Sequence, residues 1–178
     1  LSWKTRYGYV GMASFGLEFG VSDGMNEKGL AIGVLWFESD MKWQDVGAGE
    51  NKNALAQAMV GDWLLGNFSS VEDVKREIQK LKVFKYVDSD TGMSPTIHFI
   101  VYDSNGGCIV IEYEDGICHI YDNPLGIMTN APRFPWHVTN LRQYVGMSSE
   151  MPTKYKMSGL TFLPTGHGSG MFGLPGDL

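Results

Sequence analysis

Cysteine is scarce in this sequence, and positive charge is neither abundant nor clustered. Two Cys residues among 178 are too few for a disulfide framework. The 14 Lys and Arg residues are scattered along a chain of net charge −6, so nucleic acid is excluded as the main partner, because it would require a dense basic stripe. No apolar run reaches the ~18 residues of a transmembrane helix, so no membrane span is expected.

The two ends of the chain also lack distinguishing features. Residues 1–4 contain no initiator Met and have neither the basic nor the apolar region of a signal peptide. Residues 176–178 follow no segment that predicts a packed element. We therefore expect a piece cut from a longer protein, which leaves the localisation open. With 43% hydrophobic residues, residues 1–178 are expected to form a single partial domain with a sizeable core.

Apolar runs separated by turn residues predict a series of strands. Residues 7–14 alternate as a strand, and residues 30–37 form a nearly continuous apolar run that suits a strand covered on both faces. Between them, residues 22–29 carry the turn chemistry of a tight connection. Three further strands, forming an antiparallel meander, are predicted at residues 96–102, 108–113 and 117–121.

The last pair of strands reads as a β-hairpin. Asp115-Gly116 is a typical two-residue turn, which would place Tyr113 opposite Cys118. Cys108 then points to the other side of the sheet, because side chains alternate along a strand. Both Cys are therefore predicted to be packed thiols and not a disulfide.

Two helices are predicted between the early and late strands. Residues 53–65 carry Leu55, Met59 and Trp63 at helical spacing. Ser70 is a candidate N-cap of the second helix, with Asp73 three residues on. The buried stripe of that helix comprises Val71, Val74, Ile78 and Leu81. This order of elements indicates an α+β fold in which helices cover a mainly antiparallel sheet.

Three patterns could indicate a binding or catalytic site, but the residues around each of them argue against it. A G-x-G-x-x-G run begins at Gly168, but Pro175 lies where a phosphate-binding helix would run, so a flexible or substrate-covering loop fits better than a dinucleotide site. The four His residues stand at no ligand-like spacing, and no metal or other cofactor is predicted. Cys118 and His119 point to opposite faces of one strand, which argues against a catalytic dyad.

Asn130 lies in a different kind of context. Asn130 follows a short apolar segment and lies in a predicted turn just before Pro132. Two interpretations are open from the residues alone. The side chain either satisfies its own backbone as an Asx turn, or it presents a rigidly held amide at the end of a strand.

Four sequence blocks resemble, in order and rough spacing, those of the choloylglycine hydrolase family, which includes bile salt hydrolases and penicillin V acylases. The blocks are residues 23–30 (DGMNEKGL), 67–72 (NFSSVE), 129–132 (TNAP) and 173–177 (GLPGD). Residues 136–146 look like the helix that follows the Asn-Pro turn in the same family. The likeness covers nearly the whole chain. It implies an N-terminal nucleophile hydrolase, an αββα sandwich that is incomplete here, with mainly antiparallel sheets and flanking helices.

The resemblance also implies site residues. In that family an N-terminal Cys attacks a linear amide, with its own α-amino group as the base. Asn130 matches the Asn that donates to the oxyanion, and Trp36 falls at the second oxyanion or substrate position, where bile salt hydrolases usually carry Asn and many penicillin V acylases carry Tyr. Phe15, Leu17 and Phe19 would line the mouth that receives the acyl group, or else belong to ordinary core.

The expected function is therefore hydrolysis of a small N-acyl amide, of the penicillin V acylase or bile salt hydrolase type, with penicillin V slightly favoured because of Trp36. Phenoxyacetyl, bile acid and fatty acyl groups all remain open. Neither Cys lies at the start of the chain, so residues 1–178 alone are expected to be inactive. The alternative is an inactive relative or truncated product that acts as a binding or structural module. The resemblance further implies a homo-oligomer, commonly a tetramer.

Overall fold

A computed structural model describes residues 1–13, 20–38, 41–144 and 153–162. The chain divides into two units, Leu1–Phe134 and Pro135–Leu178. The first unit is built on a six-stranded sheet whose neighbouring strands all pair antiparallel. In spatial order its strands are β1 (Tyr9–Ala13), β2 (Val21–Asn26), β3 (Ala31–Trp36), β6 (Ile97–Tyr102), β7 (Cys108–Glu114) and β8 (Ile117–Asp122).

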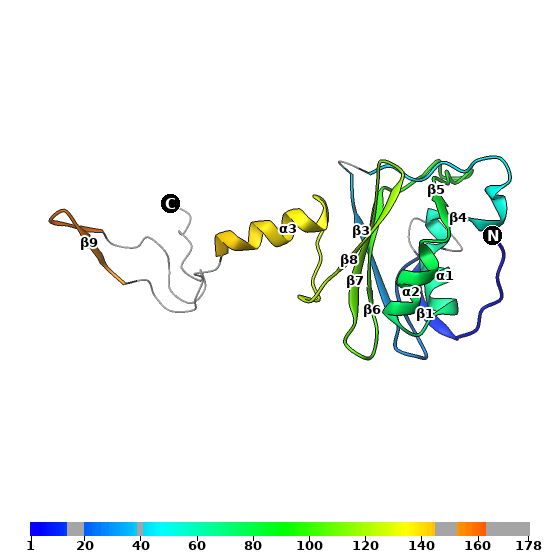
Figure 1. The fold of residues 1–178 in the computed structure, drawn as a ribbon, viewed down its shortest axis with the longest axis horizontal. Helices are drawn as coiled ribbons and strands as arrows, with labels where there is room; N and C mark the ends of the chain where they lie inside the picture. The colour runs from blue at the N-terminus through cyan, green and yellow to red at the C-terminus, as the bar shows by residue number, and fades with distance from the viewer. Residues whose placement is uncertain (14–19, 39–40, 145–152, 163–178) are drawn as a thin grey trace. The chain divides into compact units, whose positions relative to one another are not determined.

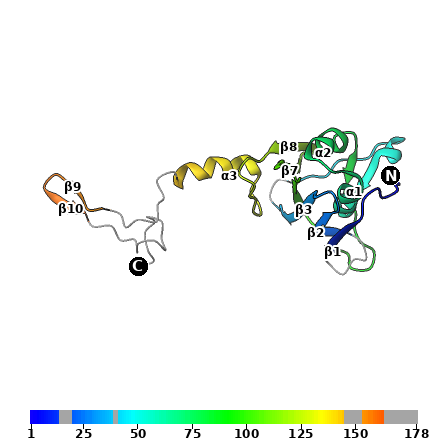
Figure 2. The same cartoon turned by 90° about the horizontal axis from the view of Figure 1, so that it is seen from below.

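A helical layer covers one face of this sheet (Figure 1 and Figure 2). It contains α1 (Val60–Asn67) and α2 (Val71–Ile78), with the short 3-10 turns Glu50–Asn53 and Gln57–Met59 before α1. Strands β4 (Ala54–Ala56) and β5 (Lys82–Phe84) pair parallel beside the helices. The main core lies between helices and sheet and includes the buried Leu30, Ile32, Leu64, Leu65, Val74, Ile78, Phe99, Val101, Ile109 and Ile111.

The opposite face of the sheet is covered unevenly by the described residues. A smaller core there comprises Ile100, Val110 and Phe134. At the β1–β2 edge, Val10 and Met25 are cross-strand partners, and their side chains are 75% and 52% exposed. Met12, next on the same face, is 68% exposed. Strand β3 forms as predicted. Ile32 and Val34 pack on the main core and Leu35 packs on the smaller core, so the strand has packing on both faces, although within β3 only Ile32 is buried.

The second unit holds most of α3 (Phe134–Asn140), a 3-10 turn at Leu141–Tyr144, and a hairpin of β9 (Tyr155–Met157) and β10 (Leu160–Phe162). The helix that the family resemblance implied after the Asn-Pro turn is thus present. Within the described ranges, no helix is both long and apolar enough to span a membrane.

The β7–β8 hairpin confirms the predicted register. Tyr113 faces Cys118, and Asp115 and Gly116 have φ angles of 48° and 75°, as a type I′ turn requires at both central positions. Cys108 packs on the smaller core and Cys118 on the main core, so both thiols are free. Local turn chemistry therefore fixed this part of the fold.

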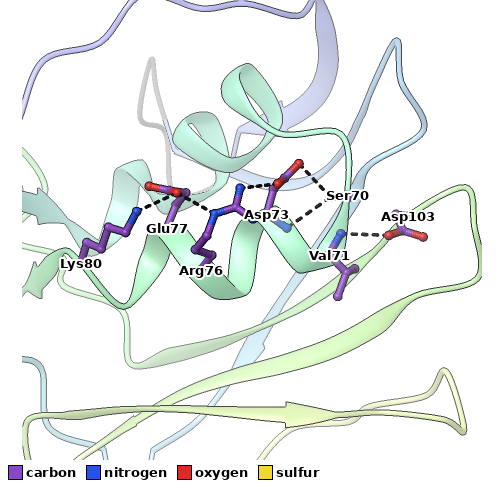
Figure 3. Close-up of polar contacts among 7 residues, drawn as sticks. All are labelled: Ser70, Val71, Asp73, Arg76, Glu77, Lys80 and Asp103. Carbon is purple, nitrogen blue, oxygen red and sulfur yellow. Dashed lines mark hydrogen bonds and ion pairs between the residues drawn. The ribbon is translucent and has the colours of Figure 1, made fainter.

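The predicted N-terminus of α2 is also confirmed. The Ser70 hydroxyl accepts a hydrogen bond from the Asp73 N–H, and the Asp103 carboxylate accepts one from the Val71 N–H (Figure 3). Asp73, Arg76, Glu77 and Lys80 continue as a chain of ion pairs along the exposed side of the helix. The predicted stripe of Val71, Val74, Ile78 and Leu81 is buried.

Two element predictions are wrong in part. Residues 21–26 form strand β2, not a turn, because α1 approaches this strand closely. A Cβ on Gly24 would lie 2.8 Å from a Leu65 methyl, and the Asn26 amide donates to the carbonyls of Leu65 and Phe68. The turn itself is confined to Glu27–Gly29. The first helix begins at Val60, because Ala54–Ala56 pairs with β5 instead of extending the helix.

Candidate active site

Two hydrogen bonds hold the Asn130 segment against the end of strand β3, and Trp36 donates in one and accepts in the other. The Trp36 N–H donates to the Asn130 side-chain oxygen at 3.0 Å, and the Ala131 N–H donates to the Trp36 carbonyl at 2.8 Å. A backbone N–H can only donate, so the group that faces it must be Oδ1. The Nδ2 donor is therefore on the side of the amide away from the Trp36 N–H. The side-chain oxygen bonds a strand 94 positions away, which favours the rigidly held amide over a purely local Asx turn.

The segment that carries Asn130 is tied to the sheet on both sides of this residue. Before it, the Tyr102 hydroxyl donates to the Gly126 carbonyl at 2.9 Å, and the Asn123 amide donates to the Ile127 carbonyl at 2.9 Å. After it, Arg133 pairs with Glu114 at 2.8 Å. These bonds explain how an irregular segment keeps one conformation.

A buried His–Glu pair lies beneath the same segment. His98 on β6 and Glu112 on β7 are both fully buried, with Nδ1 and Oε1 3.0 Å apart. His98 Nε2 is 3.1 Å from the Thr129 carbonyl, and Glu112 Oε1 also accepts the Phe134 N–H at 2.9 Å. Sequence reasoning missed this pair. The signal was present, because each residue is a polar position inside an otherwise apolar strand.

Tyr121 on β8 is close enough to Glu112 and Glu114 for their charges to affect its phenol. Burial raises the pKa of the Tyr121 phenol, and the carboxylates of Glu114 and Glu112 raise it further, while Arg133 opposes them. The phenol therefore stays neutral beside the two carboxylates.

The remaining predicted site residues have mixed outcomes. Trp36 is joined to Asn130 and Ala131 through its backbone and is 41% exposed, and its role at the second oxyanion or substrate position stays a prediction. Phe15, Leu17 and Phe19 lie outside the described residues, as does the Gly-rich run from Gly168. Among the described residues, no cluster of three His, Cys, Asp or Glu side chains is arranged to hold a metal ion.

Neither Cys resembles an activated nucleophile. Burial raises the pKa of the Cys108 thiol to about 11 and raises that of Cys118 as well, where the Tyr113 hydroxyl partly opposes the effect. A nucleophilic thiol needs the opposite shift. The two Cys side chains are therefore part of the packing.

A helical layer on one face of an antiparallel sheet is the arrangement of one half of an αββα sandwich. Residues 2–178 match the family of linear amide C-N hydrolases known as the choloylglycine hydrolase family, and the chain belongs to that family.

Relatives and solved structures agree with this placement. A bile salt hydrolase/transferase of Clostridium perfringens is 34% identical over 176 residues, which cover 97% of this chain and 53% of that protein. The crystal structure of a variant of conjugated bile acid hydrolase from Clostridium perfringens matches with a TM-score of 0.81 at 33% identity, covering 98% of this chain and 53% of that one. Penicillin V acylase from Agrobacterium tumefaciens matches at TM-score 0.65 and 27% identity, covering 83% and 45%. The chain thus spans about half the length of these proteins.

Proposed function

We propose that the protein containing this chain hydrolyses linear amide C–N bonds and that Asn130 stabilises the oxyanion. The observation that carries this proposal is the orientation of the Asn130 amide, whose oxygen is fixed by the Trp36 N–H at 3.0 Å. An amide held in this way offers its Nδ2–H to a developing negative charge without having to reorganise during the reaction.

The reaction follows from the family chemistry. A Cys thiol attacks the amide carbonyl, the carbonyl oxygen becomes an oxyanion, and the amine departs as the thioester forms. Water then releases the acid and restores the thiol. Asn130 would donate to the oxygen in both tetrahedral intermediates, which are the points where charge develops.

The substrate would be a small N-acyl amide. We place penicillin V ahead of conjugated bile salts, because an indole at position 36 supplies one N–H where a side-chain amide would supply two donors and an acceptor. An apolar acyl site discriminates weakly between apolar groups of similar size. The assay therefore includes several acyl types.

The test is hydrolysis of penicillin V, glycocholate, taurocholate and an N-acyl homoserine lactone by the complete protein. Asn130→Ala should lower kcat by about 10²–10³-fold, the effect of removing one oxyanion donor. Asn105→Ala, in the exposed turn between β6 and β7, is the matched control and should leave kcat unchanged. No turnover of any substrate by the folded complete protein would favour the alternative, a binding or structural module.

Residues 1–178 on their own should not hydrolyse these substrates. Both of their Cys thiols have raised pKa values and lie within strands, so neither replaces the family's N-terminal nucleophile. Measurable hydrolysis by the purified 178-residue chain would overturn this part of the proposal. The family resemblance also supports a homotetramer, which light scattering of the complete protein would test.

A further inference from the structure

The buried His98–Glu112 pair has a defined proton content. The Thr129 carbonyl can only accept, so His98 Nε2 must carry a hydrogen. The contact between Nδ1 and Glu112 Oε1 requires a second hydrogen between them. The two contacts together therefore require two hydrogens on the pair. Phe37, also fully buried, stacks on the imidazole with ring centroids 4.8 Å apart and planes inclined by 9°.

The contacts of this pair bracket Asn130. His98 binds the carbonyl of Thr129, the residue directly before Asn130. Glu112 binds the N–H of Phe134, at the start of α3. Both ends of residues 129–134 are thereby fixed to adjacent strands, and the Trp36 backbone fixes the middle.

Stability of the core alone does not explain these residues. Replacing a buried ion pair by apolar side chains of similar volume is often neutral or stabilising. The second carboxylate oxygen of Glu112 is buried and has no hydrogen-bond partner, which is a further cost. What apolar residues cannot supply is a directed donor to the Thr129 carbonyl and a directed acceptor for the Phe134 N–H.

We propose that His98 and Glu112 are positioning residues that orient Asn130 toward the reacting carbonyl through the backbone of residues 129–134. This inference rests on the proposed function of Asn130 as an oxyanion donor. His98 and Glu112 touch no substrate in this mechanism. They act by restricting where the Nδ2 donor lies.

Conservative variants separate positioning from folding. In His98→Gln one amide replaces two ring nitrogens, so the bonds to Thr129 and to Glu112 cannot both be made as donors with the same geometry. The network has three bonds, His98 to Thr129, His98 to Glu112 and Phe134 to Glu112. In Glu112→Gln the side chain is neutral and a neutral His98 has a single N–H, so one of these three bonds is lost. Ser70→Ala, which removes the α2 cap, is the control for general destabilisation because Ser70 contacts neither His98 nor the Asn130 segment.

The kinetic test is a double-mutant cycle in the complete protein. His98→Gln should lower kcat by up to about 10²-fold with little change in KM, as expected when a catalytic group is misplaced by about 1 Å. If His98 acts through Asn130, the His98→Gln/Asn130→Ala variant should be no slower than Asn130→Ala, within about twofold. Multiplicative losses in the double variant would overturn the proposal.

A second measurement does not depend on turnover. Hydrogen exchange at the Trp36 and Ala131 amides should accelerate at least tenfold in His98→Gln and Glu112→Gln, and should not change in Ser70→Ala. Unchanged exchange in both variants would overturn positioning even if the protein hydrolyses amides. Faster exchange in a protein without hydrolase activity would instead reject only the proposed function.

Discussion

The Trp36 N–H donates to the side-chain oxygen of Asn130 at 3.0 Å, so the backbone of Trp36 orients the Asn130 amide. A substitution at position 36 therefore changes the side chain near the site while keeping the bond that fixes Asn130. This separation gives the two residues distinct mutational signatures.

Asn130→Asp and Trp36→Ala should behave differently. In Asn130→Asp a carboxylate oxygen still accepts from the Trp36 N–H, but the Nδ2 donor is gone and a negative charge faces the oxyanion. We expect kcat to fall by about 10³-fold, at or beyond the loss for a missing oxyanion donor. Trp36→Ala retains the backbone N–H, so it should mainly raise KM. Steady-state kinetics of both variants measures this difference. A loss of kcat in Trp36→Ala as large as in Asn130→Asp would assign the oxyanion role to the indole.

Asp103 should make the stability of α2 depend on pH. Its pKa lies below the ordinary value of 3.8, first because it accepts the Val71 N–H and then because it accepts those of Gly107 and Asn105, with partial burial opposing them. A group whose pKa is lowered by folding stabilises the protein at pH values above its unfolded-state pKa. This stabilisation is lost as the pH falls through the folded-state pKa.

Asp103→Asn should therefore destabilise the protein by about 1–2 kcal/mol at pH 7, as loss of a charged helix cap does, and by progressively less in acid. Urea unfolding between pH 7 and pH 3 measures this difference. Asn105→Ala, an exposed substitution in the same turn that leaves the Asp103 carboxylate in place, should show no such trend. A difference between parent and Asp103→Asn that stays constant with pH would contradict the prediction.

Gly61→Ala should destabilise the fold even though Ala favours a helix by about 1 kcal/mol over Gly. A Cβ at position 61 would lie 2.3 Å from the Val21 carbonyl oxygen, and this backbone atom belongs to the sheet. We expect a net loss of about 2 kcal/mol or more in the free energy of unfolding. Gly8→Ala is the matched control, because a Cβ there meets nothing within 4 Å. Equal thermal midpoints for the two variants would disprove close packing of α1 on β2.

Both thiols should react slowly in the folded protein. With a pKa near 11, Cys108 is about one part in 10³ thiolate at pH 8, and Cys118 is shifted in the same direction. Iodoacetamide labelling should be slow in native residues 1–178 and should reach the rate of a model thiol in denaturant. Fast labelling of either Cys before unfolding would show that its burial is not maintained in solution.

The parts of the fold that follow from local chemistry could be predicted from the sequence. The Asp115-Gly116 turn fixes its hairpin register without help from distant residues, and Ser70 and Asp73 define the start of α2. The errors arose where distant segments meet. Gly24 and Asn26 look like turn residues, but they serve a strand that α1 approaches closely. The pairing of Ala54–Ala56 with β5 likewise overrides its helical spacing.

For the site, sequence reasoning singled out Asn130, and family resemblance added Trp36, but neither revealed what holds them. His98 and Glu112 lie one position beyond the Phe99–Ile111 pair of β6 and β7, so their contact depends on the register across the turn at residues 103–107. That register was predictable in principle from the meander. The bond from His98 to the Thr129 carbonyl was not, because it depends on the path of an irregular segment.

The exposed apolar residues Val10 and Met12 lie on β1, which forms one edge of the six-stranded sheet. A sheet edge with apolar side chains is a template for intermolecular strand pairing. Val10 and Met12 therefore make this edge of the described sheet the part of residues 1–178 most prone to pair with another chain. Purified residues 1–178 should for this reason oligomerise or precipitate as their concentration rises.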